Sequence, residues 1–370
     1  MISGCYNPSG ETGVQPAIVN SGCKEPGLVF CAVEADCFRG GYYLHEHLPL
    51  TRGDIYYHDT PADILVLFSG YIYNREELNS TYDISDSAPE PVIAAIMFLK
   101  DGPEFVGKLN GDFSIFICRP RGRKAWLFRD HMGIRPVAWS FREGYLLFSS
   151  DYRELSSRLA GGRGPDVSWL TGYFRYIDLT KTPCRGVKKL LPGHYLEYSG
   201  GSIKVTKYWD PGRIRTNQGM EYETMLSDLA NLVSDAVRKR CDGRFIAGAH
   251  VSSGIDSGVV AVMARREYSS QLPFYGYSWS PETFTAGQIP YDERELVRSL
   301  CTSAAITPVF SRITPGEFLD NTGRLFYNGG FFIEENLAGQ ASENGTNLIF
   351  SGWGGDEFIS TGDRGIETDL

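Results

Sequence analysis

A polar segment at Trp209–Gly219 separates two halves of the chain that differ in the rhythm of their apolar residues. It reads WDPGRIRTNQG, and a stretch with one proline and two glycines among polar residues is typical of a linker. Before it, short apolar and aromatic runs follow one another between turn residues. After it, such runs alternate with segments of helical spacing. A chain of 370 residues has room for two domains, and the change predicts their boundary.

The first half, residues 1–208, predicts several strands with a few helices among them. The expected strands are Leu28–Val33, Ile64–Phe68, Phe113–Cys118, Ala125–Phe128 and Tyr145–Phe148. The expected helices are Pro89–Leu99 and Tyr152–Leu159. Strands in runs favour an α+β domain built from layered sheets.

The second half, residues 220–370, predicts alternating helices and strands. The expected helices are Met220–Arg240, Val259–Tyr268, Asp292–Cys301 and Phe332–Glu343. The expected strands are Phe245–Val251, Pro273–Trp279, Thr307–Phe310 and Asn347–Phe350. Alternation of this kind predicts an α/β domain with a doubly wound parallel sheet, whose ligands bind at the carboxyl ends of the strands.

Composition narrows the class of function. The formal net charge is −9, with 36 basic against 45 acidic residues, which argues against a general nucleic-acid binder. No apolar run reaches the roughly 20 residues that span a bilayer, and Met1–Gly10 does not resemble a secretion signal. The eight cysteines form no CxxC pair. We therefore expect a cytoplasmic protein with reduced thiols.

The segment His250–Gly258, HVSSGIDSG, lies between a predicted strand and a predicted helix. Small residues let its backbone approach a ligand closely, and the following helix start offers N–H groups to an anion. The hydroxyls of Ser252, Ser253 and Ser257 add donors, and Asp256 is a candidate ligand for a magnesium ion on phosphates. A well-capped turn without function has the same composition, so the segment alone leaves both interpretations open.

A second glycine-rich segment, Ser351–Glu357 (SGWGGDE), also follows a predicted strand directly. Alone it is compatible with a surface loop. Two such loops after strands of one parallel sheet are expected to meet at one edge. Asp256 and Asp356 would then supply two carboxylates for Mg²⁺ on a nucleotide's phosphates.

These segments resemble those of a known family. Ser252–Ser257 is similar to the pyrophosphate-loop signature SGGxDS, with Ser253 in place of the first glycine, and Ser351–Glu357 is similar to SGxGxDE of the asparagine synthetase family. Four segments of the first half resemble, in order, the class II glutamine amidotransferase domain fused to those synthetases: Leu109–Phe116, Arg129–Pro136, Phe148–Asp151 and Leu191–His194.

The resemblance implies an Ntn-hydrolase-like αββα domain followed by a Rossmann-like ATP-pyrophosphatase domain. It implies an ATP- and Mg²⁺-dependent carbon–nitrogen ligase, in which a substrate carboxylate is adenylated and an amine then displaces AMP. By the same resemblance Asp256 and Asp356 are the catalytic, metal-binding carboxylates. The residues expected around ATP and its pyrophosphate are Val251, Ser252, Ser253, Gly254, Asp256, Ser257, Ser351 and Gly352, with Ser278 or Trp279 beside the adenine.

The first half departs from the family where glutamine would be hydrolysed. That chemistry needs a cysteine at position 2 whose own amine acts as the base, and here position 2 is Ile2 and the nearest thiol is Cys5. In the glutamine-binding segment Phe68–Asn74, Ser69 and Tyr71 replace the amide and carboxylate of the family pattern. We expect no glutaminase activity.

Without that ammonia source, an amine of the substrate itself is the expected nucleophile. Gly276–Pro281, Tyr291–Arg294 and Trp353–Ser360 most resemble lasso-peptide macrolactam synthetases, which join a peptide's N-terminal amine to an Asp or Glu side chain. The resemblance implies a precursor peptide as substrate, beside a leader-binding protein and a leader peptidase. Trp353 and Glu357 would lie near the substrate, although Trp353 is equally compatible with simple packing. Asp292 and Glu293 are expected to be the N-cap and first-turn acid of their helix.

Three alternatives stay open: a β-lactam synthetase, an asparagine synthetase-like enzyme that uses ammonia, and a non-catalytic nucleotide-binding scaffold. The family supplies a catalytic lysine after the SGxGxDE segment. Here no lysine follows Lys239, and the sequence ends 13 residues after Glu357. We therefore expect the second domain to be incomplete at its C-terminus.

Overall fold

A computed structural model of the chain describes residues 1–8, 27–159, 164–172, 178–215, 217, 219–283, 285, 287, 291–321 and 332–355. The chain divides into two compact units, Met1–Asn217 and Gln218–Leu370. This division falls inside the polar segment Trp209–Gly219. In the part of the chain that the structure describes, no helix has the length and apolarity needed to cross a bilayer.

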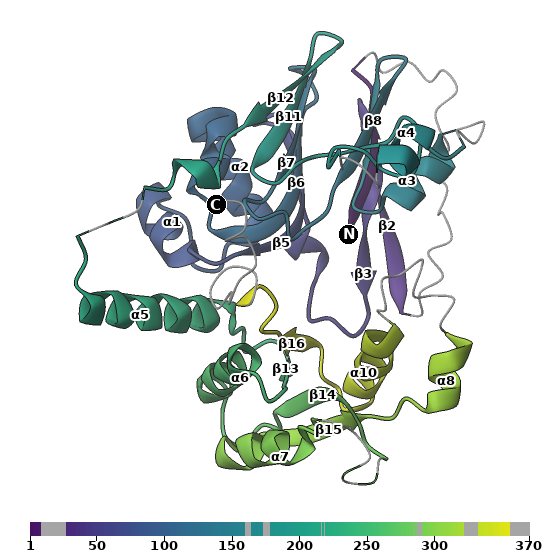
Figure 1. Cartoon of the computed structure of the whole chain (residues 1–370). Coiled ribbons are helices and arrows are strands. Elements are labelled where there is room, and N and C mark those ends of the chain that lie inside the picture. Colours follow the sequence, from purple (N-terminus) through teal and green to yellow (C-terminus); the bar gives the residue numbers. More distant parts are fainter. Residues whose placement is uncertain are drawn as a thin grey trace. The chain divides into compact units, whose positions relative to one another are not determined.

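The first unit contains two antiparallel sheets, each with six strands among the described residues (Figure 1). The first sheet has the order β10-β8-β9-β1-β3-β2, with bounds Lys188–Lys189, Ala138–Arg142, Tyr145–Ser149, Ile2–Tyr6, Phe38–His45 and Leu28–Ala35. The second has the order β12-β11-β7-β6-β5-β4, with bounds Ser202–Lys207, His194–Ser199, Lys124–Arg129, Gly111–Arg119, Ile64–Ile72 and Tyr56–Asp59. All pairings within both sheets are antiparallel.

The two sheets pack face to face through one apolar core. Phe38 and Phe148 come from the first sheet, and Phe116 comes from the second. The Phe116 ring stacks on Phe38 with 4.9 Å between centroids and on Phe148 with 4.5 Å. These are distances at which offset aromatic pairs attract one another beyond their buried area. The alternating apolar residues of the predicted strands therefore lie between the sheets.

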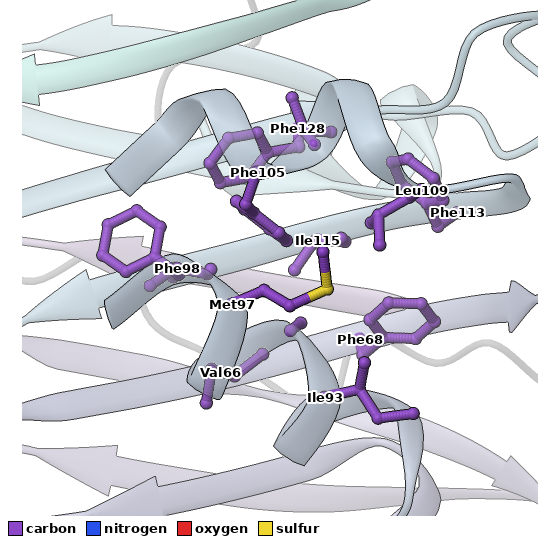
Figure 2. Packing of buried hydrophobic residues seen from close by; sticks show 14 of the residues in the cluster. Val66, Phe68, Ile93, Met97, Phe98, Phe105, Leu109, Phe113, Ile115 and Phe128 are labelled. Carbon is purple, nitrogen blue, oxygen red and sulfur yellow. The ribbon is translucent and has the colours of Figure 1, made fainter. Parts of the chain in front are cut away.

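Helices cover the outer faces of both sheets. On the second sheet lie α2 (Glu90–Asp101) and α1 (Arg75–Tyr82), and Figure 2 shows Met97 and Phe98 of α2 packed on the strands. On the first sheet lies α3 (Tyr152–Arg158), through the fully buried Leu155. The layers are therefore helix, sheet, sheet and helix, in the order that the sequence resemblance led us to expect. The remaining elements are α4 (Val167–Gly172) and the short 3₁₀ turns Arg52–Asp54, Gly102–Lys108 and Pro211–Arg213.

The second unit contains a parallel sheet with the order β15-β14-β13-β16 among the described residues. The bounds are Thr307–Ser311, Tyr275–Pro281, Ala247–His250 and Leu348–Phe350. Ala249 of the central strand β13 is opposite Gly276 on one side and Phe350 on the other. The chain runs outward from β13 to β14 and β15 and then returns to β16. The strand order thus reverses between β13 and β16, which is the switch point where such sheets bind ligands.

Helices lie on both faces of this sheet, as a doubly wound fold requires (Figure 1). One face is covered by α6 (Ile255–Glu267), α7 (Arg294–Ser303) and the end of α5 (Tyr222–Arg240). The other is covered by α10 (Phe332–Glu343), whose Leu337 packs against Tyr277. The short helix α8 spans Pro315–Asp320. All of the predicted strands and helices of this half are present within a few residues of the expected bounds.

Helix α6 begins earlier than expected, and helix α5 buries few of its apolar residues. Helix α6 begins at Ile255 rather than Val259, because the extended Gly254 already occupies its N-cap position. On α5, Met225, Leu229 and Leu232, whose spacing predicted the helix, are exposed, and only Val237 is buried. The periodicity therefore identified the helix correctly but not which residues are covered.

Candidate nucleotide-binding site

Two loops leave the sheet of the second unit at its switch point. The first begins at Val251 after β13, and the second begins at Ser351 after β16. Val251 is buried and its amide donates to the Tyr277 carbonyl oxygen at 2.9 Å, which extends the sheet by one residue before the chain turns. Because β13 and β16 are neighbours, both loops start from the same edge of the sheet. The two glycine-rich segments singled out in the sequence are therefore adjacent in space.

The first loop is held by its own serines. The amide of Ser252 donates to Ser257 Oγ at 3.2 Å, and the two hydroxyl oxygens are 2.7 Å apart. The Gly254 amide donates to Ser252 Oγ at 3.1 Å. Short side chains thus satisfy backbone donors that a helix start leaves unpaired, and they fix the loop at the N-terminus of α6.

Ser253 instead makes its hydrogen bonds outside the loop. Its amide and its hydroxyl both donate to Glu293 Oε2, each at 2.9 Å. The other carboxylate oxygen of Glu293 accepts from Ser280 Oγ at 3.0 Å. The residue that departs from the family's glycine therefore binds a carboxylate that comes from the start of α7.

The expected roles of Asp292 and Glu293 at the start of α7 are partly confirmed. Asp292 Oδ1 accepts from the Arg294 amide, the first of the helix, at 3.1 Å, although Asp292 is not the N-cap residue. Glu293 occupies the N-cap position, but its side chain makes no capping hydrogen bond. Asp292 also holds the guanidinium of Arg294 at 2.6 and 2.8 Å, and this ion pair lowers the pKa of Asp292 to about 2. The Glu293 carboxylate accepts hydrogen bonds from Ser253 and Ser280 and none from the amides of its own helix.

The second loop packs on the first turn of α6 through glycines. A β-carbon built on Gly352 would lie 2.6 Å from the Ser257 amide nitrogen. One built on Gly355 would lie 2.4 Å from the carboxylate carbon of Asp256. Contacts under 3.0 Å are not found for real side chains. Gly352 meets backbone atoms and therefore requires glycine, whereas a side chain at Gly355 would displace the Asp256 carboxylate. The glycine spacing of the second loop is thus explained by its approach to Asp256 and Ser257.

The remaining predicted residues of the second loop are only partly described. Trp353 has 70% of its surface exposed, so the alternative that it is a packed apolar ring does not hold. Its amide donates to Ser351 Oγ at 3.1 Å, which closes the turn at the start of the loop. Asp356 and Glu357 lie outside the described residues.

At the end of β14, Ser278 is fully buried and accepts a hydrogen bond from the Ser280 amide at 3.3 Å. The next residue, Trp279, is half exposed, and its indole donates to Glu334 Oε2 of α10 at 2.9 Å. Glu334 Oε1 also lies 2.9 Å from His250 Nε2. The His250 contact, with a smaller effect of Trp279, holds the pKa of the Glu334 carboxyl below its usual value despite partial burial.

The described part of the site offers one carboxylate to a magnesium ion on a phosphate chain. Mg²⁺ is usually bound by one or two carboxylates together with substrate phosphates, and Asp256 supplies a carboxylate where the two loops meet. No cluster of three or more His, Cys, Asp or Glu residues occurs within the described ranges, so they contain no metal centre of that size made by the protein alone. Asp256 and Asp356 would hold the ion, and it would neutralise charge on the phosphates.

Sequence reasoning missed the Glu293–Ser253 contact and the His250–Glu334–Trp279 group. Glu293 is 40 residues from Ser253, and Glu334 is 55 residues from Trp279. No local pattern links residues so far apart. The sequence offered one signal, which is that each of the two glutamates stands near the start of a predicted helix.

The first unit buries Cys5, the cysteine nearest in sequence to the family's nucleophile position. Cys5 lies within β1, is 7% exposed, and burial raises its pKa to about 12. Ile2, the residue at the family's nucleophile position, is fully buried.

The conformation of the Arg129–Pro136 segment is held by Asp130. Its buried carboxylate accepts from the amides of Ile134 and Arg135 at 2.9 and 2.8 Å.

Both units contain a segment that matches a known protein family. Residues 55–209 match the family described as "Glutamine amidotransferase domain", and residues 228–364 match the family "Asparagine synthase". The chain is therefore similar to the asparagine synthetase family in both of its units. Its two matched domains occur in the order that the motifs predicted, whereas the subtype within the family is not decided by these matches.

Individual relatives are distant. The chain is 26% identical to asparagine synthetase [glutamine-hydrolyzing] 2 of Bacillus subtilis (strain 168), over 59% of this chain and 31% of that protein. It is 26% identical to the asparagine synthetase [glutamine-hydrolyzing] of Cricetulus griseus, over 60% of this chain and 41% of that protein. The chain thus spans about a third to two fifths of these relatives. Among solved structures, glutamine phosphoribosylpyrophosphate amidotransferase of B. subtilis matches with a TM-score of 0.34, at 10% identity, over 71% of this chain and 56% of that one.

Proposed function

We propose that the second unit binds ATP at the loops Val251–Ser257 and Ser351–Gly355, and that the protein is an AMP-forming carbon–nitrogen ligase. One observation carries the proposal. The two loops meet at the switch point of a parallel sheet, with Gly352 and Gly355 against the first turn of α6. A site of this kind suits an anion, because a helix start and small residues bring backbone donors close to it.

In the proposed reaction a substrate carboxylate attacks the α-phosphorus of ATP and pyrophosphate leaves. An amine then attacks the acyl-adenylate carbonyl, AMP leaves, and an amide forms. Ser252, Ser253, Gly254 and Ser257 would donate hydrogen bonds to the pyrophosphate as its charge grows. Val251, Ser351 and Gly352 would contact the nucleotide, with Ser278 or Trp279 on the adenine side.

Glutamine is not proposed as the ammonia source. The family's nucleophile position holds the buried Ile2, and the Cys5 thiol, with its pKa raised to about 12, is almost entirely protonated at neutral pH. Cys5 also lies within a strand, so its own amine is a peptide nitrogen and not a free base. In this proposal the first unit is a structural platform.

The proposed substrate is a leader-free precursor peptide, closed by joining its N-terminal amine to an Asp or Glu side chain. Trp353 supports this choice, because an aromatic ring with 70% of its surface exposed beside the nucleotide loops suits contact with a peptide. The partners that we propose for this enzyme are a leader-binding protein and a leader peptidase.

The test is turnover with Mg²⁺, ATP and leader-free peptides that carry an Asp or Glu at different positions. We expect AMP and pyrophosphate to appear only with a cognate peptide, which loses the mass of one water molecule. Asparagine formed from aspartate and ammonia would favour an ammonia-using synthetase. Turnover with a β-amino carboxylate would favour a β-lactam synthetase. ATP binding without turnover in any mixture would favour the non-catalytic scaffold.

A further inference from the structure

Glu293 occupies hydrogen-bond donors that a phosphate group would need. One of its oxygens accepts from both the amide and the hydroxyl of Ser253 at 2.9 Å, and the other accepts from Ser280 Oγ at 3.0 Å. The carboxylate is thereby bound at the tip of the loop that leads into α6. It is an anion from the chain itself, held where the proposed function puts an anion of the substrate.

This contact is not needed to start α7. The first turn of that helix is anchored by Arg294, whose guanidinium pairs with Asp292 and donates to the Pro281 carbonyl oxygen at 3.3 Å. Glu293 stands at the N-cap position without capping the helix. Its side chain is therefore used entirely on the residues of the neighbouring loop and strand.

Occupation by Glu293 and by phosphate exclude each other. A backbone amide has a single proton, and it cannot donate at full strength to two acceptors. Two anions that share one small set of donors also repel each other strongly. A phosphate oxygen can reach the donors of Ser253 only after the Glu293 carboxylate has moved away.

We propose that Glu293 is an internal competitor for the phosphate chain of ATP: it fills the Ser253 donors in the ligand-free protein and is displaced when the nucleotide binds. The inference rests on the proposed function, because it takes these donors to be part of the ATP site. In this proposal Glu293 weakens nucleotide binding, and binding of the nucleotide moves the start of α7.

The test is calorimetric titration of Mg·ATP, and separately of Mg·pyrophosphate, into the full chain and its variants. Removing one charged acceptor from these donors is worth about tenfold in affinity, so Glu293→Ala should bind both ligands about tenfold more tightly than the wild type. Glu293→Gln keeps the size and loses the charge, and it should show a smaller gain. Ser280→Ala loosens Glu293 without touching the loop, and it should bind about threefold more tightly.

The matched control is Glu295→Gln, two residues further along in the first turn of the same helix, where the exposed side chain pairs with Arg298. Its affinity should equal that of the wild type. Unchanged or weaker binding by Glu293→Ala and Ser280→Ala, with a wild type that binds ATP, would overturn the inference and leave the proposed function standing. Absence of ATP and pyrophosphate binding in every protein would overturn both.

Discussion

Gly352 lies so close to the Ser257 amide that a β-carbon on the glycine would be 2.6 Å from that nitrogen. The nearest atoms are all backbone atoms of the first turn of α6, which cannot swing away as a flexible side chain would. A glycine of the second loop is thus fitted to the loop that the first segment forms. The relationship explains why the two segments have small residues at matching places.

Gly352→Ala is expected to push the two loops apart. Forcing a methyl group into this contact should cost about 1–3 kcal/mol of unfolding free energy and lower ATP affinity by more than about tenfold. Chemical unfolding and ATP titration measure the two effects. Gly339→Ala, in the middle of α10 with open space around its β-carbon, is the control and should be neutral or slightly stabilising. Equal ATP affinity in both variants would contradict the account of this contact.

Glu334→Gln is expected to reduce stability in a pH-dependent way. The pKa of the native Glu334 is lowered, chiefly by His250, so its ionised form stabilises the fold above the usual glutamate pKa of 4.5 and this contribution is lost as the pH falls. The variant should be less stable than the wild type by about 1 kcal/mol at neutral pH and equal to it near pH 3. Urea unfolding at both pH values tests this. A difference that is the same at both would show that charge is not involved.

Cys5 is expected to resist alkylation in the folded protein. Burial raises its pKa to about 12, and the thiolate is the reactive form, so iodoacetamide at about pH 8 should leave it unmodified. Peptide mass mapping after brief labelling measures this, with the unfolded protein as the control in which Cys5 reacts. The same preparation should release no glutamate from glutamine. Rapid labelling of native Cys5 would refute the account of a silent first unit.

Asp130→Ala is expected to destabilise the first unit. The carboxylate is fully buried and accepts from the amides of Ile134, Arg135 and the buried Phe113, so its removal leaves these donors without their acceptor. The loss should be about 2–4 kcal/mol of unfolding free energy. Glu77→Ala, which removes an exposed carboxylate on α1, should change little. Similar unfolding midpoints for both variants would mean that the Asp130 contacts do not hold this segment.

The sequence predicted most of the second unit because its signals are local. Helical spacing and apolar runs located its elements, and the segments after β13 and β16 were correctly expected to meet. Distant pairings had no such signal. Glu293 reaches Ser253 across 40 residues. The Asp292–Glu293 pattern favoured a simple helix cap, which holds for the Asp292 carboxylate on the Arg294 amide but not for Glu293.

In the first unit, packing overrides local preference. Strand β3 was not singled out, and it contains Gly40 and Gly41, residues that strands disfavour. A β-carbon on Gly40 would lie 2.4 Å from the Ser3 carbonyl oxygen, and one on Gly41 would lie 2.3 Å from that of Cys31. The glycines are required by the close approach of β1 and β2, which is visible only once the strands are paired.

The central claim is that the two loops bind the phosphates of ATP with Asp256 as a metal ligand, and titration calorimetry tests it most directly. Mg·ATP and Mg·pyrophosphate would be titrated into the wild type, into Asp256→Asn, and into Asp228→Asn, which changes an exposed carboxylate on α5. The account predicts that the wild type and Asp228→Asn bind both ligands equally and that Asp256→Asn binds at least about tenfold more weakly. Equal binding by all three proteins, or no binding by the wild type, would contradict it.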